Sequence, residues 1–424
     1  MHPTPASEVD LSRYIRPGDR VVLAQATAEP QTLARLLIAQ RHRFPGVEVF
    51  IGPCYTDLFA SAETDGLRFV SYGALGSASQ LAASGRLDVL TIPYGRLSTA
   101  YATGEFRADV VLMQVAPALP GRRHSAGLSN DFALSAMAHA RAVILEVDPH
   151  TPRTHGAELP ANATITLRVH SEHRPPETTQ PPLGAIEVEI ARRVVALIPD
   201  QATVQMGVGT LPNAIMAALM SHRDLGIHSG VMGDPAVDLI ETGVVTNAHK
   251  GLDLGITITN TLIGTRKLYD FAHNRRDVEV RPGTYTHSLD IMARLNRLIA
   301  INGGLEVDLG GQVNTEVAGG RYLGALGGGL EFTRGAALSP GGRAIVAMAS
   351  MTANGRHSRI VPRVAIATIP RADVDTIVTE HGVSELRGVT LRERARRLIA
   401  IAAPAQREAL ERAAYAMEGC SRAN

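Results

Sequence analysis

The sequence contains no tryptophan, only 4% aromatic residues, two cysteines and almost no net charge. Because large aromatic side chains are scarce, small aliphatic residues have to fill the core, and apolar residues make up 45% of the 424 positions. The 42 Lys and Arg residues nearly balance the 41 Asp and Glu residues. The charge therefore gives no reason to expect a nucleic-acid or membrane partner.

Long apolar runs and secretory signals are missing as well. No stretch approaches the roughly 18 consecutive apolar residues that a membrane helix needs, and residues 1–15 show no signal-peptide pattern. The two cysteines, Cys54 and Cys420, lie far apart in the sequence, which argues against a disulfide. We expect a soluble protein in a reducing, cytoplasmic setting.

The spacing typical of metal ligands is also absent. The sequence has 15 histidines, and His155, His228, His287 and His357 stand near motifs described below. None of them belongs to an HxxxH or CxxC pattern or to a carboxylate cluster at ligand spacing. We therefore expect no metal site, and we interpret a lone histidine first as a packed, hydrogen-bonded residue.

What the chain does contain is an internal repeat. Residues 17–30 and 199–212 share a turn, an apolar run, small residues, a proline and a helical pattern. The offset is 182 both from Pro17 to Pro199 and from Pro30 to Pro212. A repeated strand, loop and helix predicts two related α/β halves that face each other, with the chemistry in the cleft between them.

Alternation of short apolar runs with helical stretches favours mainly parallel sheets covered by helices. The length suggests two domains, and the proline-rich segment 171–184 is interpreted as their linker. We predict an N-terminal domain over residues 1–175 and a C-terminal domain over residues 185–424. The predicted strands of the two halves are 21–24, 47–51, 69–72, 89–92, 110–115 and 142–147, then 202–206, 225–228, 298–301, 344–347 and 364–369.

Two glycine-rich segments are candidates for ligand contact. The loop Gly207-Val208-Gly209-Thr210-Leu211 lies between a predicted strand and a predicted helix, where backbone N–H groups can face a ligand. A tight strand-to-helix turn requires glycine in any case, so this signal is weak alone. The second segment has six glycines within residues 319–329, which favours close backbone approach to a ligand over a packed helix or strand.

Motifs along most of the chain resemble the acetyl-CoA hydrolase/transferase family, which includes 4-hydroxybutyrate and butyrate–acetate CoA-transferases. They include THG from Thr154, MGVGTLPNAIMAAL from Met206, DLIETGVVTN from Asp238, AINGGLEVDLGGQVNTE from Ala300 and VTEHGVSELRG from Val378. So long a collinear series is specific for the family and much less specific for the substrate. The resemblance implies two internally duplicated α/β domains of the CoA-transferase type, with mainly parallel sheets.

The resemblance also implies a mechanism and a binding site. A glutamate of the enzyme attacks the acyl-CoA carbonyl, and an anhydride and then a glutamyl-CoA thioester follow. By resemblance, CoA contacts the loop Gly207 to Leu211 and the pair Gly327-Gly328, and Asn302 and Leu305 lie in the adjoining segment. CoA and acyl-CoA are then substrates rather than permanently bound cofactors, CoA lies mainly on the second half, and the acyl or acid group lies near the interface.

One position departs from the family pattern. Where transferases of the family read HSE or HTE, this chain has His228-Ser229-Gly230, and glycine has no nucleophile. Three interpretations stay open: another carboxylate acts, water activated by His228 hydrolyses the thioester, or the protein binds CoA without turnover. We rank Glu63 first as the replacement, because it follows the carboxyl end of the strand 47–51. Glu29 comes next, ahead of Asp234 and Glu306.

We therefore expect a CoA-transferase that moves CoA between a short-chain or dicarboxylic acyl-CoA, such as acetyl-CoA, and a free carboxylic acid. The alternatives are an acyl-CoA hydrolase and a catalytically silent CoA-binding or regulatory protein. The expected partners are small molecules and a second copy of the chain, in a homodimer. The sequence leaves the identity of the acid, the assembly and the pathway open.

Overall fold

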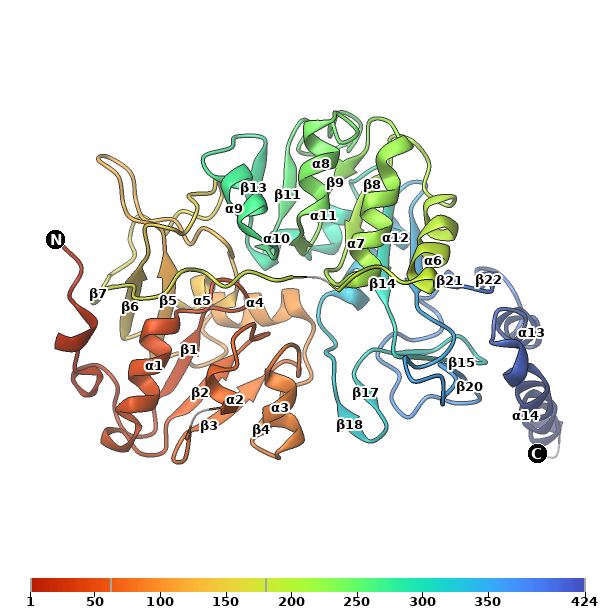
Figure 1. Cartoon of the computed structure of the whole chain (residues 1–424), viewed down its shortest axis with the longest axis horizontal. Coiled ribbons are helices and arrows are strands. Elements are labelled where there is room, and N and C mark those ends of the chain that lie inside the picture. The colour runs from red at the N-terminus through yellow and green to blue at the C-terminus, as the bar shows by residue number, and fades with distance from the viewer. Residues whose placement is uncertain (1, 62, 180, 423–424) are drawn as a thin grey trace.

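The structure is a computed structural model that describes residues 2–61, 63–179 and 181–422. In Figure 1 the two halves of the chain lie side by side along the long axis, with the N-terminus at one end and the C-terminal helices at the other. The segment 171–184 runs between them, and its described residues form no helix or strand, as predicted for a linker. The extent of the two domains, 1–175 and 185–424, stays a prediction.

The first half is built on a seven-stranded sheet in which all neighbouring strands run parallel. Every residue of its two six-residue strands is buried, as expected for a parallel sheet covered on both faces. In spatial order the strands are β4 (Leu87–Val89), β3 (Arg68–Ser71), β2 (Glu48–Ile51), β1 (Arg20–Leu23), β5 (Val110–Val115), β6 (Ala142–Val147) and β7 (Leu167–His170). The α-helices are α1 (Gln31–Ala39), α2 (Leu58–Ser61), α3 (Ala78–Ala83), α4 (Tyr94–Ala102) and α5 (Phe132–Ala136), with short 3-10 turns at Ala6–Glu8, Leu11–Arg13 and Arg41–Arg43.

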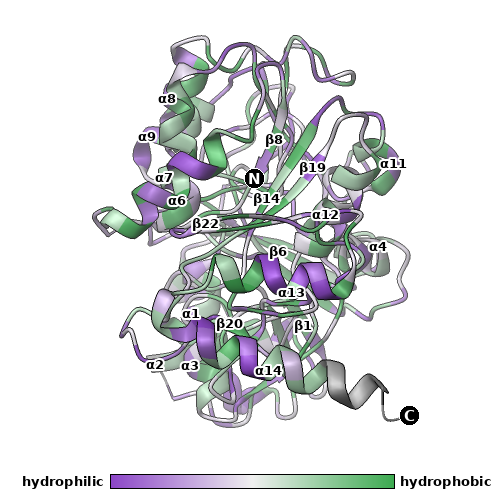
Figure 2. Ribbon diagram, turned by 90° about the vertical axis from the view of Figure 1, so that its right-hand side faces the viewer, coloured by the Kyte–Doolittle hydropathy of each residue, from purple (hydrophilic) through white to green (hydrophobic). Residues whose placement is uncertain are grey.

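The second half contains a six-stranded sheet in which all neighbouring strands run parallel except β21 and β22, which are antiparallel. In spatial order its strands are β22 (Gly382–Glu385), β21 (Thr376–Thr379), β19 (Arg343–Ala347), β14 (Leu298–Gly303), β8 (Thr203–Met206) and β9 (Gly226–Ile227). Its helices are α6 (Ala185–Val195), α7 (Thr210–Ala218), α8 (Pro235–Glu241), α9 (Arg266–Ala272), α10 (Gly283–Thr286), α11 (Leu289–Met292), α12 (Gly329–Leu338), α13 (Leu391–Ala400) and α14 (Pro404–Arg422), and a 3-10 turn spans Leu219–Ser221. The strands β8 and most of β14 are buried, whereas α13 and α14 carry hydrophilic stretches (Figure 2).

Smaller sheets connect these elements. They pair β10 (Val231–Met232) with β12 (Thr261–Leu262), β11 (Thr257–Thr259) with β13 (Val278–Val280), β15 (Glu306–Asp308) with β16 (Val313–Asn314) and β20 (Ile360–Val361), and β17 (Val317–Ala318) with β18 (Arg321–Tyr322).

Both large sheets are wound in the same way. In each, the first strand (β1 or β8) is followed by neighbours on one side, and the chain then crosses to the other side (β5 or β14) and continues outward. Each first strand is followed by a helix, α1 after Pro30 and α7 around Pro212, as the repeat predicts. This topology places a switch point between β8 and β14, and open α/β sheets bind ligands outside the carboxyl ends of such strands.

One predicted strand is wrong, and another is displaced, because 89–92 overlaps β4 only at Val89. Residues 364–369 form no strand, and only Ile369 joins Val313 in an isolated bridge. The position next to β19 is taken instead by β21, the buried run Thr376–Thr379, and β22 forms the edge of the sheet. The apolar residues of 364–369 therefore belong to a partly buried loop, whereas the strand next to β19 has threonine at both ends.

The two halves share packing and hydrogen bonds. Helix α4 of the first half packs on α10 of the second, and Ala74 N–H donates to the carbonyl of Gly324 at 2.8 Å. One cluster of buried apolar side chains includes residues from both sheets, such as Val22 of β1 and Ile301 of β14. The interface therefore holds fixed the relative position of the loops that follow β1 and β14.

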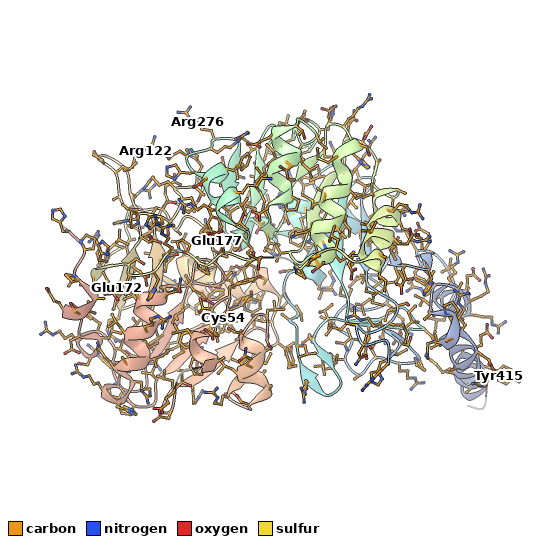
Figure 3. All side chains as sticks on the ribbon, viewed as in Figure 1. Cys54, Arg122, Glu172, Glu177, Arg276 and Tyr415 are labelled. Carbon is orange, nitrogen blue, oxygen red and sulfur yellow. The ribbon has the colours of Figure 1, made fainter. Side chains whose placement is uncertain are left out.

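The remaining features of the fold concern free thiols, metal ligands and membrane-spanning helices. Cys54 carries a free, buried thiol inside the first half (Figure 3), whereas the side chain of Cys420 lies outside the described residues. Over residues 2–61, 63–179 and 181–422, no cluster of three or more His, Cys, Asp or Glu side chains is arranged to hold a metal ion. In the same ranges, no helix is both long and apolar enough to cross a bilayer.

Candidate active site

A cavity of about 420 Å³ lies between the two halves, and we name it the central cavity. The first half contributes the loops after β1, β2 and β3 and the start of α4. The second half contributes, among other segments, the ends of β8 and β14 and the loop before α12. Its volume is in the range of small-ligand sites. It is lined by Gln25, Ala26, Pro53, Tyr55, Tyr72, Leu75, Gly76 and Tyr94 of the first half, and by Gln205, Met206, Gly207, Val208, Gly230, Val231, Asn260, Thr261, Ile263, His287, Asn302, Gly303, Thr315, Ala325, Leu326, Gly327, Gly328, Gly329, Phe332 and Ile369 of the second.

A second depression of about 560 Å³, the outer groove, lies on the second half. It runs over the start of α7 and the segment after β19, and its lining includes Thr210, Leu211, Ser350 and Arg359. Four residues line both the outer groove and the central cavity: Gly207, Val208, Asn302 and Gly303. They follow β8 or end β14, so the junction of the two spaces lies at the predicted switch point.

Two helix N-termini face this system. Gly209 is the residue before α7. Its φ of 125° is a backbone conformation that residues other than glycine rarely adopt. Gly327, with φ of 55°, leads into α12, and Gly328 and Gly329 line the central cavity. Because the first N–H groups of a helix lack partners within it, both ends offer donors and a partial positive charge to an anionic ligand.

The side chain nearest to Gly230 is His287. A Cβ atom added at Gly230 would lie 3.0 Å from Nε2 of His287, and one added at Gly328 would lie 2.4 Å from the same atom. The ring is held between Tyr94 and Phe332, with centroid distances of 4.8 and 4.9 Å. Its Nδ1 contacts Oγ1 of Thr286 at 2.9 Å, so Nε2 is the nitrogen directed at the two glycines.

Burial decides the charge of this imidazole. It lowers the pKa of His287 to about 3, and the neighbouring His228 acts in the same direction. His287 is therefore neutral near pH 7. A neutral imidazole in this position can accept or donate one hydrogen bond but brings no positive charge into the central cavity.

A hydrogen-bonded network lines the opposite wall. Tyr72 donates to the side-chain oxygen of Gln25 at 2.9 Å, and the Gln25 amide donates to Tyr94 Oη at 2.9 Å. Tyr94 in turn donates to Oδ1 of Asn260 at 2.8 Å, which links the first half to the second. Burial raises the pKa of both tyrosines well above the usual value, so both hydroxyls stay protonated. This wall is polar but uncharged.

The predicted catalytic residues do not meet in this space. Gly230 lines the central cavity, but His228 does not: its ring is fully buried and its Nε2 is 3.0 Å from the carbonyl of Thr286. The Glu63 carboxylate lies on the surface with 92% of its side chain exposed, 3.5 Å from Arg41. The reason is local: eleven residues separate the end of β2 from Glu63, and α2 lies between them. We therefore do not retain Glu63 as the nucleophile.

Glu29, the second-ranked carboxylate, lies closer to the central cavity, but its oxygens already accept hydrogen bonds from the protein. Glu29 accepts hydrogen bonds from the N–H groups of Tyr55 and Thr56 at 2.9 and 3.2 Å and from the Thr56 hydroxyl at 2.8 Å. It is buried behind the wall formed by Pro53 and Tyr55 and does not line the central cavity. Burial raises its pKa to about 7. Its contacts indicate that it fixes the loop after β2.

The two lower-ranked carboxylates are also engaged away from the central cavity. Asp234 accepts from the N–H of Thr265 at 3.0 and 3.2 Å, ahead of α9. Glu306, in β15, accepts from the amide of Asn314 across its sheet at 3.0 Å. Both therefore have structural partners.

Most of the predicted CoA contacts line one or both of these spaces. Gly207, Val208 and Asn302 line both spaces, Thr210 and Leu211 line the outer groove, and Gly327 and Gly328 line the central cavity. Gly209 and Leu305 line neither, although Gly209 sets the start of α7. Which of these residues contact CoA stays a prediction.

The fold and the site together define a class of protein. It is a doubly wound α/β protein with a glycine-lined site at the switch point of its second sheet. Within that class, the chain belongs to the acetyl-CoA hydrolase/transferase family. Residues 264–414 match the model of the acetyl-CoA hydrolase/transferase C-terminal domain. A 4-hydroxybutyrate coenzyme A transferase from Clostridium kluyveri is 35% identical over 400 residues, which is 92% of each chain.

Two solved structures of similar proteins have the same fold. RipA from Yersinia pestis superposes with a TM-score of 0.91 at 30% identity and 96% coverage of each chain. A 4-hydroxybutyrate CoA-transferase from Porphyromonas gingivalis gives a TM-score of 0.79 at 30% identity, again with 96% of each chain covered. The family and fold implied by the motifs are thus confirmed.

Proposed function

We propose that this enzyme moves CoA between an acyl-CoA thioester and a free carboxylic acid. The observation that carries the proposal is the junction of the outer groove with the central cavity at Gly207, Val208, Asn302 and Gly303. The groove can hold the nucleotide part of CoA, and the junction can admit the pantetheine arm. The thioester then lies in the central cavity beside Gly328 and the start of α12.

The substrate acid is proposed to be short and to carry a polar group. The central cavity, at about 420 Å³, suits small acyl and acid groups, and its far wall presents Gln25, Tyr72, Tyr94 and Asn260. These uncharged donors and acceptors suit a hydroxyl or a second carboxyl group. The 4-hydroxybutyrate named for two similar proteins fits this description, and acetyl-CoA is a suitable small donor.

Asn302 is the residue we propose to hold the ligand at the junction. Its Nδ2 is buried without a hydrogen-bond partner, and a buried unpaired donor costs about 1–3 kcal/mol. A carbonyl oxygen of the thioester or of the pantetheine arm would satisfy it. Its Oδ1 is 3.4 Å from the Gln205 amide nitrogen, a weak contact.

The test incubates the enzyme with acetyl-CoA and a panel of short acids, and separates the thioesters by chromatography. We expect a new acyl-CoA only when the acid is present. Asn302→Ala should lower kcat/KM by about 10- to 100-fold, in line with one lost hydrogen bond to a buried ligand. Glu63→Gln, on the exposed surface, is the matched control and should behave as the unchanged enzyme.

A second candidate function is acyl-CoA hydrolysis, and His287 is the observation that favours it. Its Nε2 is directed at Gly230 inside the central cavity, where a bound water would lie next to the thioester. Release of free CoA without any acid would support this candidate over transfer. Tight CoA binding without turnover would support a silent binding protein. A cytoplasmic location and a homodimer stay predictions from the sequence.

A further inference from the structure

The central cavity contains no carboxylate among the residues that the structure describes. At the position where the family pattern has a glutamate, Gly230 leaves no side chain, and the space in front of its Cα is limited by Nε2 of His287 and by Phe332. The ionisable groups that do line the cavity are tyrosines and His287, and none of them can form an anhydride with an acyl group. A covalent enzyme–CoA thioester at residue 230 is therefore chemically impossible.

Nearby carboxylates cannot take over without leaving existing contacts. Glu29 is held by two backbone N–H groups behind the cavity wall. Glu331, in the first turn of α12, accepts from the N–H of Gly95 at 3.0 and 3.1 Å and so caps α4 of the other half. Neither side chain lines the central cavity.

The exchange of CoA between two acids still requires an anhydride, because a free thiolate does not displace a carboxylate oxygen directly. If the enzyme supplies no carboxylate, one other carboxylate is always present in the reaction: the acceptor acid itself. The central cavity, at about 420 Å³, has room for a short acyl thioester and a second small acid.

We propose that CoA transfer in this enzyme occurs directly between the two substrates in a ternary complex, with no covalent enzyme intermediate. An oxygen of the acceptor carboxylate attacks the thioester carbonyl, the C–S bond breaks, and a mixed anhydride and the CoA thiolate form. The thiolate then attacks the acceptor's carbonyl carbon. The bond between that carbon and the shared oxygen breaks, and the donor acid leaves with that oxygen. No net proton or electron is exchanged. This inference rests on the proposed transferase function.

The surroundings suit two bound carbonyl groups better than a charged side chain. The N-terminus of the ten-residue helix α12 points donors at the cavity through Gly328 and Gly329, which stabilises the oxyanion that develops in each attack. The unpaired Nδ2 of Asn302 offers another donor at the junction. The polar wall with Tyr72 and Gln25 gives the acceptor acid a place opposite the thioester.

The decisive experiment follows oxygen in a single turnover. Enzyme in excess over acetyl-CoA is mixed with an acceptor acid, 4-hydroxybutyrate, whose carboxyl group carries two ¹⁸O atoms, and the acids and thioesters are analysed by mass spectrometry. Direct transfer predicts acetate with one ¹⁸O atom, formed together with the new thioester. A covalent intermediate predicts unlabelled acetate together with the new thioester, because the first acetate leaves with an oxygen of the enzyme, and this result overturns the inference alone.

Failure of the proposed function gives different products. Unlabelled acetate and free CoA without a new thioester indicate hydrolysis, and this overturns transfer and the inference together, as does the absence of any reaction across the acid panel. A second measurement uses acetyl-CoA alone followed by borohydride reduction and peptide mapping. We expect no reduced residue, and a reduced glutamate, at Glu29 or elsewhere, overturns the ternary complex. Initial rates against both substrates should give intersecting rather than parallel lines.

Discussion

Two adjacent glycines, Gly327 and Gly328, allow the geometry around His287 to be tested. Gly328 has φ of −96°, which any residue adopts, so Gly328→Ala introduces no backbone strain. The added methyl group would instead lie 2.4 Å from both Cδ2 and Nε2 of His287. Gly327 is the reverse case, because it has φ of 55° and nothing lies within 4 Å of an added Cβ atom.

The size of the effect follows from these distances. A methyl group needs about 3.5 Å to a ring atom, so Gly328→Ala requires the imidazole to move by about 1 Å. Tyr94 and Phe332 hold the ring on both sides, so the move must disturb packing, at a cost of about 1–3 kcal/mol. A displacement of about 1 Å at a reaction centre can lower the rate about 100-fold. Gly327→Ala should cost about 1–2 kcal/mol through the left-handed backbone and leave His287 in place.

The assay compares both variants in urea denaturation and in the steady-state transfer reaction. We expect similar losses of stability but very different rates: about 100-fold lower kcat for Gly328→Ala and less than about fivefold for Gly327→Ala. The difference isolates the clash with His287 from general destabilisation. If Gly328→Ala keeps the unchanged rate, the thioester does not lie beside Gly328 and the start of α12.

Three further predictions concern buried groups of the fold. Burial lowers the pKa of His228 to about 3, so the unfolded chain binds more protons than the folded chain between pH 3 and about 6.5. The free energy of unfolding should therefore fall as the pH falls through this window. His228→Gln should make that fall less steep, as measured by chemical denaturation at several pH values. Glu331→Ala should lower the free energy of unfolding by about 1 kcal/mol because the Gly95 N–H loses its acceptor, and an unchanged urea midpoint would show that this cap is dispensable. Burial also raises the pKa of the Cys54 thiol, so a thiol reagent at pH 8 should label Cys54 only after denaturation, and rapid labelling of the native protein would contradict its burial.

Much of the fold could be predicted from local pattern. The runs 110–115 and 142–147 coincide with β5 and β6, because continuous apolar runs between turns are typical of strands buried on both faces. The repeat of a strand, a loop and a proline-started helix marked β1 with α1 and β8 with α7. The strand at Thr376–Thr379 was missed since its threonines have no clear apolar period, and they are buried only because neighbouring strands cover them.

The sequence by itself determined the family, the two α/β halves, the glycine loops at the junction and the loss of a carboxylate at Gly230, because each depends on residues close together in the chain. Only the tertiary structure decided which side chains lie beside Gly230. His287 lies 57 residues beyond Gly230, yet its ring lies beside that glycine, whereas Glu63 follows α2 and lies exposed at the surface. The direction of a side chain and the contacts between distant segments depend on the whole packed chain, and no local pattern encodes them.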